Sequence, residues 1–209
     1  MKKVFSVAIA ATLLLAPFIV FGQEQAPPTK FKEGDFWQFK AREWDAIGKS
    51  SKLFDGLWEI SASQGKVKVL YLTGDKKEEV DLAQVSAQGA WLFALIGRSK
   101  FYPDLKFPFS VGDKWNWDYK APIYGTNKIL SRSVEVRVTG IEQVATPAGT
   151  FRTFKLEKDD RSGPRNVYVT TIFYSPETKS VVKSLLDASV GGGAGAKREI
   201  ELIKFGSAP

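Results

Sequence analysis

The chain contains no histidine and no cysteine among its 209 residues. The absence of histidine removes the most common general base of enzymes and the most common metal ligand. Without cysteine, the usual zinc and copper sites and Ser-His-Asp or Cys-His catalysis are also excluded. Only carboxylate, Lys, Tyr or Ser-Lys chemistry is left. We therefore expect no catalytic residues, no metal site, no cofactor and no enzyme activity.

The lack of cysteine also means that no disulfide bond can stabilise the fold. Stability must then come from burial of apolar surface. The 15 Phe, 6 Trp and 6 Tyr residues supply large side chains for a core.

Long apolar runs are absent except at the N-terminus. Residues 1–22 combine the basic pair Lys2-Lys3, an apolar stretch to about Val20 and the exit Val20-Phe21-Gly22, as a secretory signal does. A membrane anchor is the alternative interpretation. Because no cysteine follows, acylation as a lipoprotein is not expected. We predict signal cleavage, an exported protein in the periplasm or outside the cell, and no membrane span after cleavage.

Charge of one sign does not accumulate in the chain. Without residues 1–22, 28 basic and 23 acidic residues leave a net charge of +5. Basic residues lie among acids, as in Asp75–Glu79 and Lys155–Arg161, which is typical of a solvated surface. This mixture and the signal argue against nucleic acid as a partner.

Alternation with a period of two recurs along the chain and predicts strands. Val80–Ile96 fits two strands, with a short helix through Asp81–Gln88 as the alternative. Gly-rich residues Ala188–Ala196 and polar residues Asp159–Arg165 are predicted to be loops. The other expected strands are Phe31–Glu43, Leu53–Ser63, Lys66–Thr73, Val111–Ala121, Ile129–Glu142, Thr150–Lys158, Asn166–Tyr174, Ser180–Leu186 and Arg198–Phe205.

Two stretches open with the same pattern, EGDFWQFKA at Glu33–Ala41 and VGDKWNWDYKA at Val111–Ala121. Gly34-Asp35 matches Gly112-Asp113 at an offset of 78, and residues 57–63 match residues 134–140 at an offset of 77. This similarity favours an internal duplication. The alternative is that any β-meander contains short matching runs.

These signals predict an all-β fold, an antiparallel meander of about ten strands closed into a barrel or folded into a sandwich. We expect a signal peptide at 1–22, a flexible leader at 23–33 and a single β-rich domain at 34–206. Its two halves would span about 34–97 and 111–206, joined by a connector at 98–110. The oligomeric state does not follow from the sequence.

Three runs occur in an order that resembles a family of secreted bacterial all-β domains of unknown function. They are FPFSVGDKWNW (Phe107–Trp117), VATPAGTFRTFKLE (Val144–Glu157) and FYSPETKSVVK (Phe173–Lys183). The family's motifs are FP-x-x-VG-x-x-W, V-x-TPAGTF and Y-SPE-x-x-x-VVK. The resemblance covers roughly Phe101–Phe205 and implies an exported antiparallel β-protein, with no catalytic residues to transfer.

Several short motifs suggest chemistry but fit structural roles better. Gly191–Lys197 lacks the Ser or Thr of a phosphate-binding loop. Ser180 and Lys183 have Ser-x-x-Lys spacing, but a strand directs positions i and i+3 to opposite faces. Ser63 and Lys66 have the same spacing across a turn. The carboxylates that could serve a hydrolase are Asp113 with Asp118, and Glu157 with Asp159 and Asp160.

Aromatic residues on alternating strands are the best candidates for a site, because aromatic rings stack on sugars or line apolar cavities. Packing in the core is the competing interpretation. The leading hypothesis is an exported, non-enzymatic envelope protein that binds an apolar or glycan ligand, with a lipid, a glycan or an envelope protein as partner. The alternatives are a structural or protein-interaction module and a carboxylate-based hydrolase. The candidate ligand-binding residues are Trp37, Trp44, Trp58, Trp115, Trp117 and Tyr119.

Overall fold

The fold was analysed in a computed structural model, which describes residues 24–27, 32–44, 56–64, 66–71, 77–81, 105–122, 129–191 and 193–207. These ranges contain strands and turns and no helix, which confirms the predicted all-β class. The strands are β1 (Gln25–Ala26), β2 (Asp35–Trp44), β3 (Gly56–Ser63), β4 (Lys66–Tyr71), β5 (Lys77–Asp81), β6 (Phe109–Ser110), β7 (Lys114–Pro122), β8 (Ile129–Thr146), β9 (Gly149–Arg161), β10 (Val167–Ser175), β11 (Ser180–Val190) and β12 (Gly193–Ser207).

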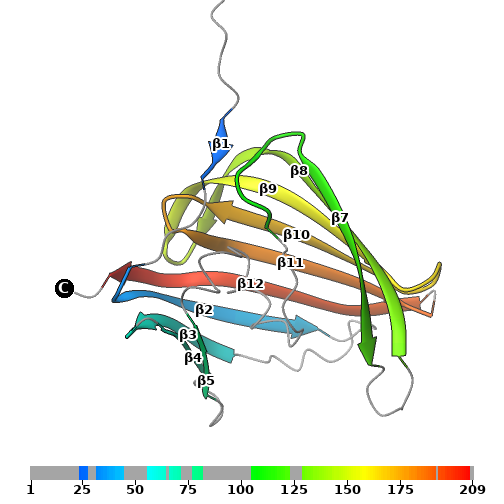
Figure 1. The fold of residues 1–209 in the computed structure, drawn as a ribbon, viewed down its shortest axis with the longest axis horizontal. Helices are drawn as coiled ribbons and strands as arrows, with labels where there is room; N and C mark the ends of the chain where they lie inside the picture. Colours follow the sequence, from blue (N-terminus) through cyan, green and yellow to red (C-terminus); the bar gives the residue numbers. More distant parts are fainter. Residues whose placement is uncertain are drawn as a thin grey trace, which may run out of the picture.

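Ten strands form one antiparallel sheet in the order β5-β4-β3-β2-β12-β11-β10-β9-β8-β7. Neighbours in sequence are neighbours in the sheet, except that β12 pairs with β2 and so joins the two ends of the chain. Within the described residues the end strands β5 and β7 do not pair. The sheet is therefore open and sandwich-like, and the closed barrel that was the other predicted form is not observed. Figure 1 shows the curled sheet, with β7 and β8 steeply inclined to β12 and β2.

The long hairpin of β8 and β9 bends over to reach β12. A β-bulge between Val138 and Gly140 interrupts the pairing of the two strands, and bulges increase local bending and twist. At the hairpin tip, the Ala148 backbone N–H donates to the Leu202 carbonyl at 3.3 Å. The tip is the predicted Thr146–Gly149 turn, and Gly149 adopts the positive φ of 139° that a side chain disfavours.

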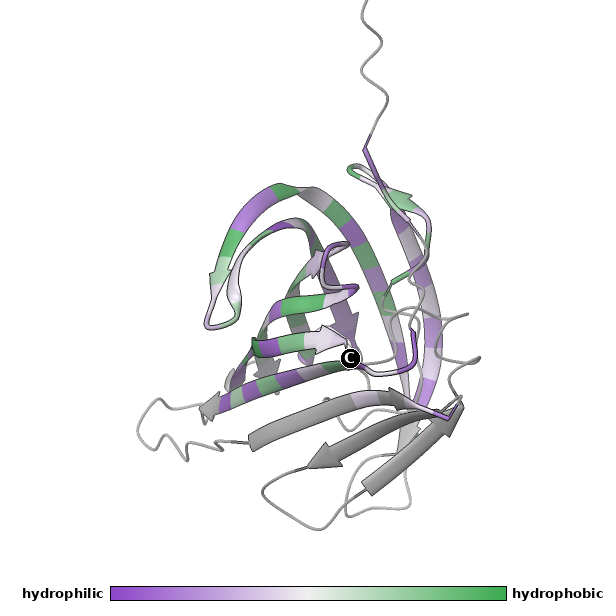
Figure 2. Cartoon of the chain, turned by 90° about the vertical axis from the view of Figure 1, so that its left-hand side faces the viewer, coloured by the Kyte–Doolittle hydropathy of each residue, from purple (hydrophilic) through white to green (hydrophobic). Residues whose placement is uncertain are grey.

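The core lies on one face of the sheet, which we call the inner face. Hydrophobic and hydrophilic residues alternate along the strands (Figure 2), so one face of each strand is apolar. One row of directly paired positions crosses six strands, and every member is at most 6% exposed. This row is Val138, Leu156, Ile172, Ser184, Ile200 and Ala41.

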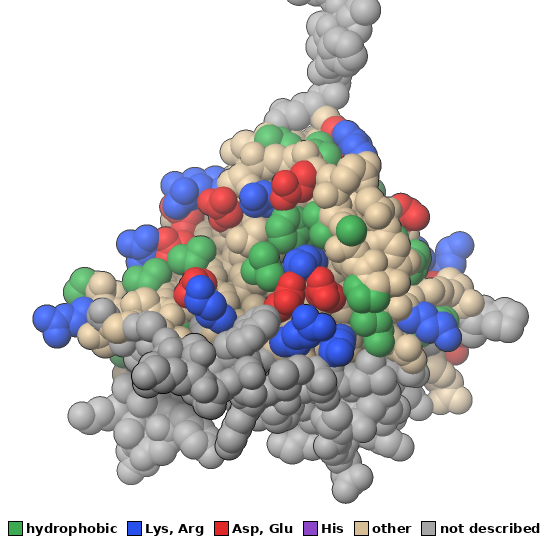
Figure 3. Space-filling view, turned by 180° about the vertical axis from the view of Figure 1, so that it is seen from behind, with side chains coloured by type: hydrophobic (Ala, Val, Ile, Leu, Met, Phe, Trp, Pro, Cys, Tyr) green, Lys and Arg blue, Asp and Glu red, His purple; other side chains and the backbone are tan. Residues whose placement is uncertain are grey.

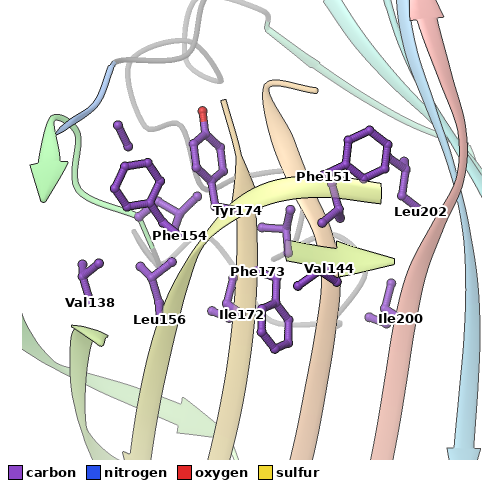
Figure 4. Close-up of a cluster of buried hydrophobic side chains, with 14 of the residues drawn as sticks. Val138, Val144, Phe151, Phe154, Leu156, Ile172, Phe173, Tyr174, Ile200 and Leu202 are labelled. Carbon is purple, nitrogen blue, oxygen red and sulfur yellow. The ribbon is translucent and has the colours of Figure 1, made fainter. Parts of the chain in front are cut away.

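Aromatic rings complete the core above this row. The Phe109 ring packs edge-on against Phe154 at 5.4 Å and Tyr174 at 5.8 Å between centroids, and Figure 4 shows Phe154 beside Tyr174. Fully burying each such ring stabilises a fold by roughly 1.5–3 kcal/mol. Phe109 and buried Leu105 come from the expected connector 98–110, so its described part also contributes to the core.

The two Gly-Asp openings have the same geometry. Gly34 and Gly112 adopt positive φ values of 82° and 94°. In each turn the aspartate Oδ2 accepts a hydrogen bond from the backbone N–H three residues earlier, at 2.8 Å for Asp35 and 2.7 Å for Asp113. The predicted turn that launches each strand is therefore present twice.

The pairing of the strands that follow changes the alignment of the halves by one residue. Trp37 pairs with Ile60, and Trp115 pairs with Val136. Ile60 and Val136 lie 76 positions apart, whereas the alignment of the two halves from the sequence uses an offset of 77 for these strands. One residue matters because successive side chains in a strand point to opposite faces.

Three sequence predictions differ from the structure. Gln25 and Ala26 of the expected flexible leader form β1, which pairs with β6, and Ala26 is fully buried. Residues 159–161 of the expected polar loop belong to β9, and most of the expected loop Ala188–Ala196 belongs to β11 and β12. Of Val80–Ile96, residues 80 and 81 end β5, and the rest lies outside the described residues.

Candidate functional site

Trp37 is a core residue. Its side chain is 2% exposed, and its indole Nε1–H donates to the Thr178 carbonyl at 2.7 Å. Phe39, two residues along β2, is fully buried. Trp37 and Phe39 of the predicted aromatic set therefore pack in the core.

Trp44 and Trp58 cannot be assigned to a site. Their backbones form part of β2 and β3, where Trp58 pairs with Phe39. Their side chains lie outside the described parts of the structure, as does the loop Asp45–Ser51 that was expected to place them at a cavity mouth.

The aromatic stripe of β7 has the predicted period. Trp115, Trp117 and Tyr119 are half-buried, whereas Asn116 and Asp118 between them are exposed. The stripe lies on the inner face, because Trp115 and Trp117 pair with the buried residues Val136 and Val134. Unlike Trp37, these three side chains keep part of their surface in contact with solvent.

The indole N–H groups of Trp115 and Trp117 are notable donors on this stripe. Trp115 Nε1 and Trp117 Nε1 are buried and have no hydrogen-bond partner within the described structure. An unmade hydrogen bond on a buried donor costs about 1–3 kcal/mol. Two such donors, side by side on one strand, are the feature of this face that packing alone does not account for.

The stripe runs from the core to a polar cluster. At its upper end the Trp115 ring lies 6.0 Å from Phe109. At its lower end the Tyr119 hydroxyl donates to Asp160 Oδ2 at 2.8 Å. Tyr119 therefore links the aromatic surface to a buried carboxylate.

Asp160 also holds Arg132. Arg132 Nε donates to Asp160 Oδ1 at 2.8 Å, and the two side chains are 15% and 10% exposed. The Arg132 guanidinium lies over the Tyr168 ring, 4.3 Å from its centroid, and 5.7 Å from the Tyr119 ring. We call these four residues, Tyr119, Arg132, Asp160 and Tyr168, the Arg132 cluster.

The cluster keeps the guanidinium charged. Burial lowers the pKa of Arg132, but the hydrogen bond and charge of Asp160, with smaller effects of Tyr119 and Tyr168, outweigh it and raise the pKa overall. In this environment Arg132 is a fixed cation.

The inner face becomes polar toward this cluster. One row below the apolar row of the core, the paired positions are Val136, Lys158, Thr170, Leu186 and Arg198. The Lys158 ammonium lies 6.0 Å from the Trp117 ring centroid. The next row contains Trp117, Val134, Asp160, Tyr168 and Ala188.

The carboxylates proposed for a hydrolase are not paired across a cleft. Asp113 accepts its turn hydrogen bond, and Asp118 is exposed on the opposite face of β7 from Tyr119. Asp159 binds Arg161 on one face of β9, and Asp160 binds Arg132 on the other.

The Ser180-x-x-Lys183 motif does not form a nucleophile–base pair. Ser180 Oγ donates to the Val181 carbonyl, whereas the Lys183 ammonium binds Glu199 at 2.7 Å and Glu201 at 2.8 Å. Burial lowers the Lys183 pKa, but the two carboxylates outweigh it and raise the pKa, so this lysine stays protonated. The sequence analysis did not predict the contacts of Lys183 with Glu199 and Glu201, because these residues lie on different strands and meet only when β11 pairs with β12.

Other ligand classes find no support in the described ranges. They contain no group of three or more acidic, His or Cys side chains that could hold a metal ion. They also contain no helix with the length and hydropathy needed to cross a bilayer. On the face seen in Figure 3, basic and acidic side chains are intermingled rather than gathered by sign.

Neither family models nor curated protein sequences match this chain. Solved structures are similar to it, and three of them are the following. The hypothetical lipoprotein YmcC from Escherichia coli shares 12% identity over 83% of this chain and 85% of its own, with a TM-score of 0.42. A "putative exported protein with YmcC-like fold" from Bacteroides fragilis (13% identity, 87% and 100% of the chains) and a "putative lipoprotein" from Parabacteroides distasonis (14%, 86% and 97%) both have TM-scores of 0.40. Similarity this distant does not indicate what the chain does.

Proposed function

We propose that this chain is an exported, non-enzymatic protein of the bacterial envelope that binds a ligand on the aromatic stripe of β7. The observation that carries the proposal is the pair Trp115 and Trp117, which are half-exposed on the inner face and whose two buried N–H groups have no acceptor among the described residues. In a purely structural role such donors are usually paired.

The stripe suits a ligand that combines a ring or an acyl chain with oxygen atoms. The faces of Trp115, Trp117 and Tyr119 offer apolar and π surface, on which sugar rings or acyl chains pack. The indole N–H groups donate to hydroxyl, ether or carbonyl oxygens of the same ligand. An apolar ligand with a polar head and a glycan both meet these requirements.

Export is supported by the order of features in residues 1–22, namely two lysines, an apolar run and a short exit before polar residues. The absence of His and Cys from the whole chain supports the non-enzymatic part, because the common proton shuttles and nucleophile activators are missing. Fractionation of cells should find the protein outside the cytoplasm with Gln23 at its N-terminus. A cytoplasmic chain that retains residues 1–22 would contradict export.

The binding proposal is tested by tryptophan fluorescence during titration of the purified protein with 1-dodecanol and with chitotetraose. We expect one of them to shift the emission, and the Trp117→Ala variant to bind it at least tenfold more weakly. Val169→Ala is the matched control, because Val169 is 42% exposed on β10 and lies away from the stripe. No response to either compound would reject ligand binding and leave a structural or protein-interaction module, the role that buried Trp37 supports.

A further inference from the structure

The Arg132 cluster holds its guanidinium through Nε and through the ring of Tyr168. Arg132 Nε is hydrogen-bonded to Asp160. Within the described residues, no hydrogen bond or ion pair occupies Arg132 Nη1 or Nη2. The terminal fork of this guanidinium is therefore available to another acceptor.

Both oxygens of Asp160 already accept a hydrogen bond from a group other than that fork. Its Oδ1 accepts from Arg132 Nε, and its Oδ2 accepts from the Tyr119 hydroxyl. Stacking on the Tyr168 ring fixes the plane of the guanidinium. An arginine anchored through Nε and by its flat face presents two parallel N–H groups in a fixed direction, which is the geometry that binds carboxylate or phosphate bidentately.

The charges nearby also favour an anion. Lys158 lies on the same face of β9 as Asp160, two residues along the strand. Arg132 and Lys158 thus place two cationic side chains beside Asp160 on the inner face. The neighbouring side chains Trp117, Val134 and Ala188 are apolar or aromatic, so an oxyanion there would be less screened than in water.

We propose that the inner face binds an amphipathic molecule with an oxyanion head, and that the Arg132 fork holds this head while its body lies along Trp117 and Trp115. The inference rests on the proposed function and adds the charge of the ligand to it. The direction of the ligand follows from the inner face, which is apolar along the row Val138–Leu156–Ile172 and carries the Arg132–Asp160 ion pair two rows further along the strands. Arg132 and Trp117 are binding residues, and Asp160 is a positioning residue.

Matched pairs of probes test the head group. Dodecanoate and dodecyl phosphate share the chain of 1-dodecanol but carry an oxyanion, and tetragalacturonate serves as the anionic counterpart of chitotetraose. We expect an anionic member to bind on the order of tenfold to a hundredfold more tightly than its neutral counterpart, since charge-assisted hydrogen bonds are about twice as strong as neutral ones. The two alkyl anions distinguish a carboxylate head from a phosphate head.

Variants assign the preference to Arg132. Arg132→Gln should remove the preference for the anion, so that the anionic and neutral members of a pair bind equally. Arg132→Lys keeps the charge but loses the fork, so it should retain only part of the preference. Asp160→Asn should weaken anion binding through the orientation of Arg132. Arg137→Gln is the matched control, because exposed Arg137 lies on β8 and pairs with Glu135 on the other face.

The outcomes separate the two proposals. If the anionic and neutral probes bind equally, or if Arg132→Gln keeps the full preference while circular dichroism shows a native sheet, the oxyanion site is wrong and the ligand-binding face stands. If Arg132→Gln does not fold, Arg132→Lys decides in its place, and an unchanged preference there overturns the bidentate contact. If no probe changes the fluorescence, both proposals fail.

Discussion

The carboxylate of Asp35 lies 2.7 Å from the ammonium of Lys179, 144 positions later in the chain. Asp35 is 2% exposed and also accepts hydrogen bonds from the Lys32 backbone N–H and the Ser207 hydroxyl. One side chain therefore connects the start of β2, the turn between β10 and β11, and the end of β12.

Removing the Asp35 charge should destabilise the fold. In Asp35→Asn the buried carboxylate is lost and Lys179 keeps an unpaired ammonium, so the free energy of unfolding should fall by about 2–3 kcal/mol. Asp113→Asn is the matched control, because Asp113 occupies the equivalent turn, is exposed and caps only Ser110. Its effect should stay within about 0.5 kcal/mol by urea denaturation. Equal effects of the two variants on the free energy of unfolding would contradict the role of Asp35 in connecting β2, the β10–β11 turn and β12.

Stability should depend on this carboxyl in acid. Burial raises the pKa of Asp35, but hydrogen bonds from Lys179, Ser207 and Lys32 and the Lys179 charge outweigh it, so the pKa lies below its ordinary value of 3.8. A lowered pKa stabilises the fold above the unfolded pKa, and this contribution is lost as pH falls through the folded pKa. The stability difference between the wild type and Asp35→Asn should be constant from pH 5 to 7 and shrink below about pH 4. A difference that is unchanged at pH 3 would count against this assignment.

Gly195 allows β12 to approach β11 closely. A Cβ at this position would lie 2.3 Å from the Ala188 carbonyl oxygen and 2.7 Å from its carbonyl carbon, both of them backbone atoms. Gly195→Ala should therefore lower the free energy of unfolding by about 1–3 kcal/mol. At Gly140 a Cβ meets nothing within 4 Å. Gly140→Ala should leave the free energy of unfolding nearly unchanged, and thermal denaturation of both variants measures the difference. A Gly195→Ala variant as stable as the wild type would show that β11 and β12 can move apart at little cost in free energy.

Two leucines provide a test of where the core lies. Leu156 is fully buried in the central row of the inner face, whereas Leu185 on β11 is 37% exposed. Leu156→Ala should cost about 2–5 kcal/mol through lost burial and a cavity. Leu185→Ala should cost less than about 1 kcal/mol. If chemical denaturation gave a comparable loss of unfolding free energy for both variants, the face of the sheet that carries Leu185 would also be buried against other residues.

Local patterns were sufficient to predict much of the sheet. Trp115, Trp117 and Tyr119 were expected on one face of β7 and lie there, because alternation depends on the strand alone. The Gly-Asp turns and the turn before Gly149 were also expected, since positive φ and side-chain capping are properties of a few adjacent residues.

The misplaced elements depend on partners far along the chain. Two residues, Gln25 and Ala26, have no detectable period and become β1 only by pairing with Ser110 and Phe109. The glycines near position 195 suggest a loop, yet they form a strand because β11 lies against them.

The sequence by itself determined the all-β class, most strand positions and the exclusion of histidine and cysteine chemistry, because composition and period-two alternation are local properties. Only the tertiary structure decided that the sheet stays open, that Trp37 is enclosed while Trp117 is not, and that Tyr119, Arg132, Asp160 and Tyr168 meet. These outcomes depend on the curl of the sheet and the register of four strands, which set distances between residues that are far apart in the chain.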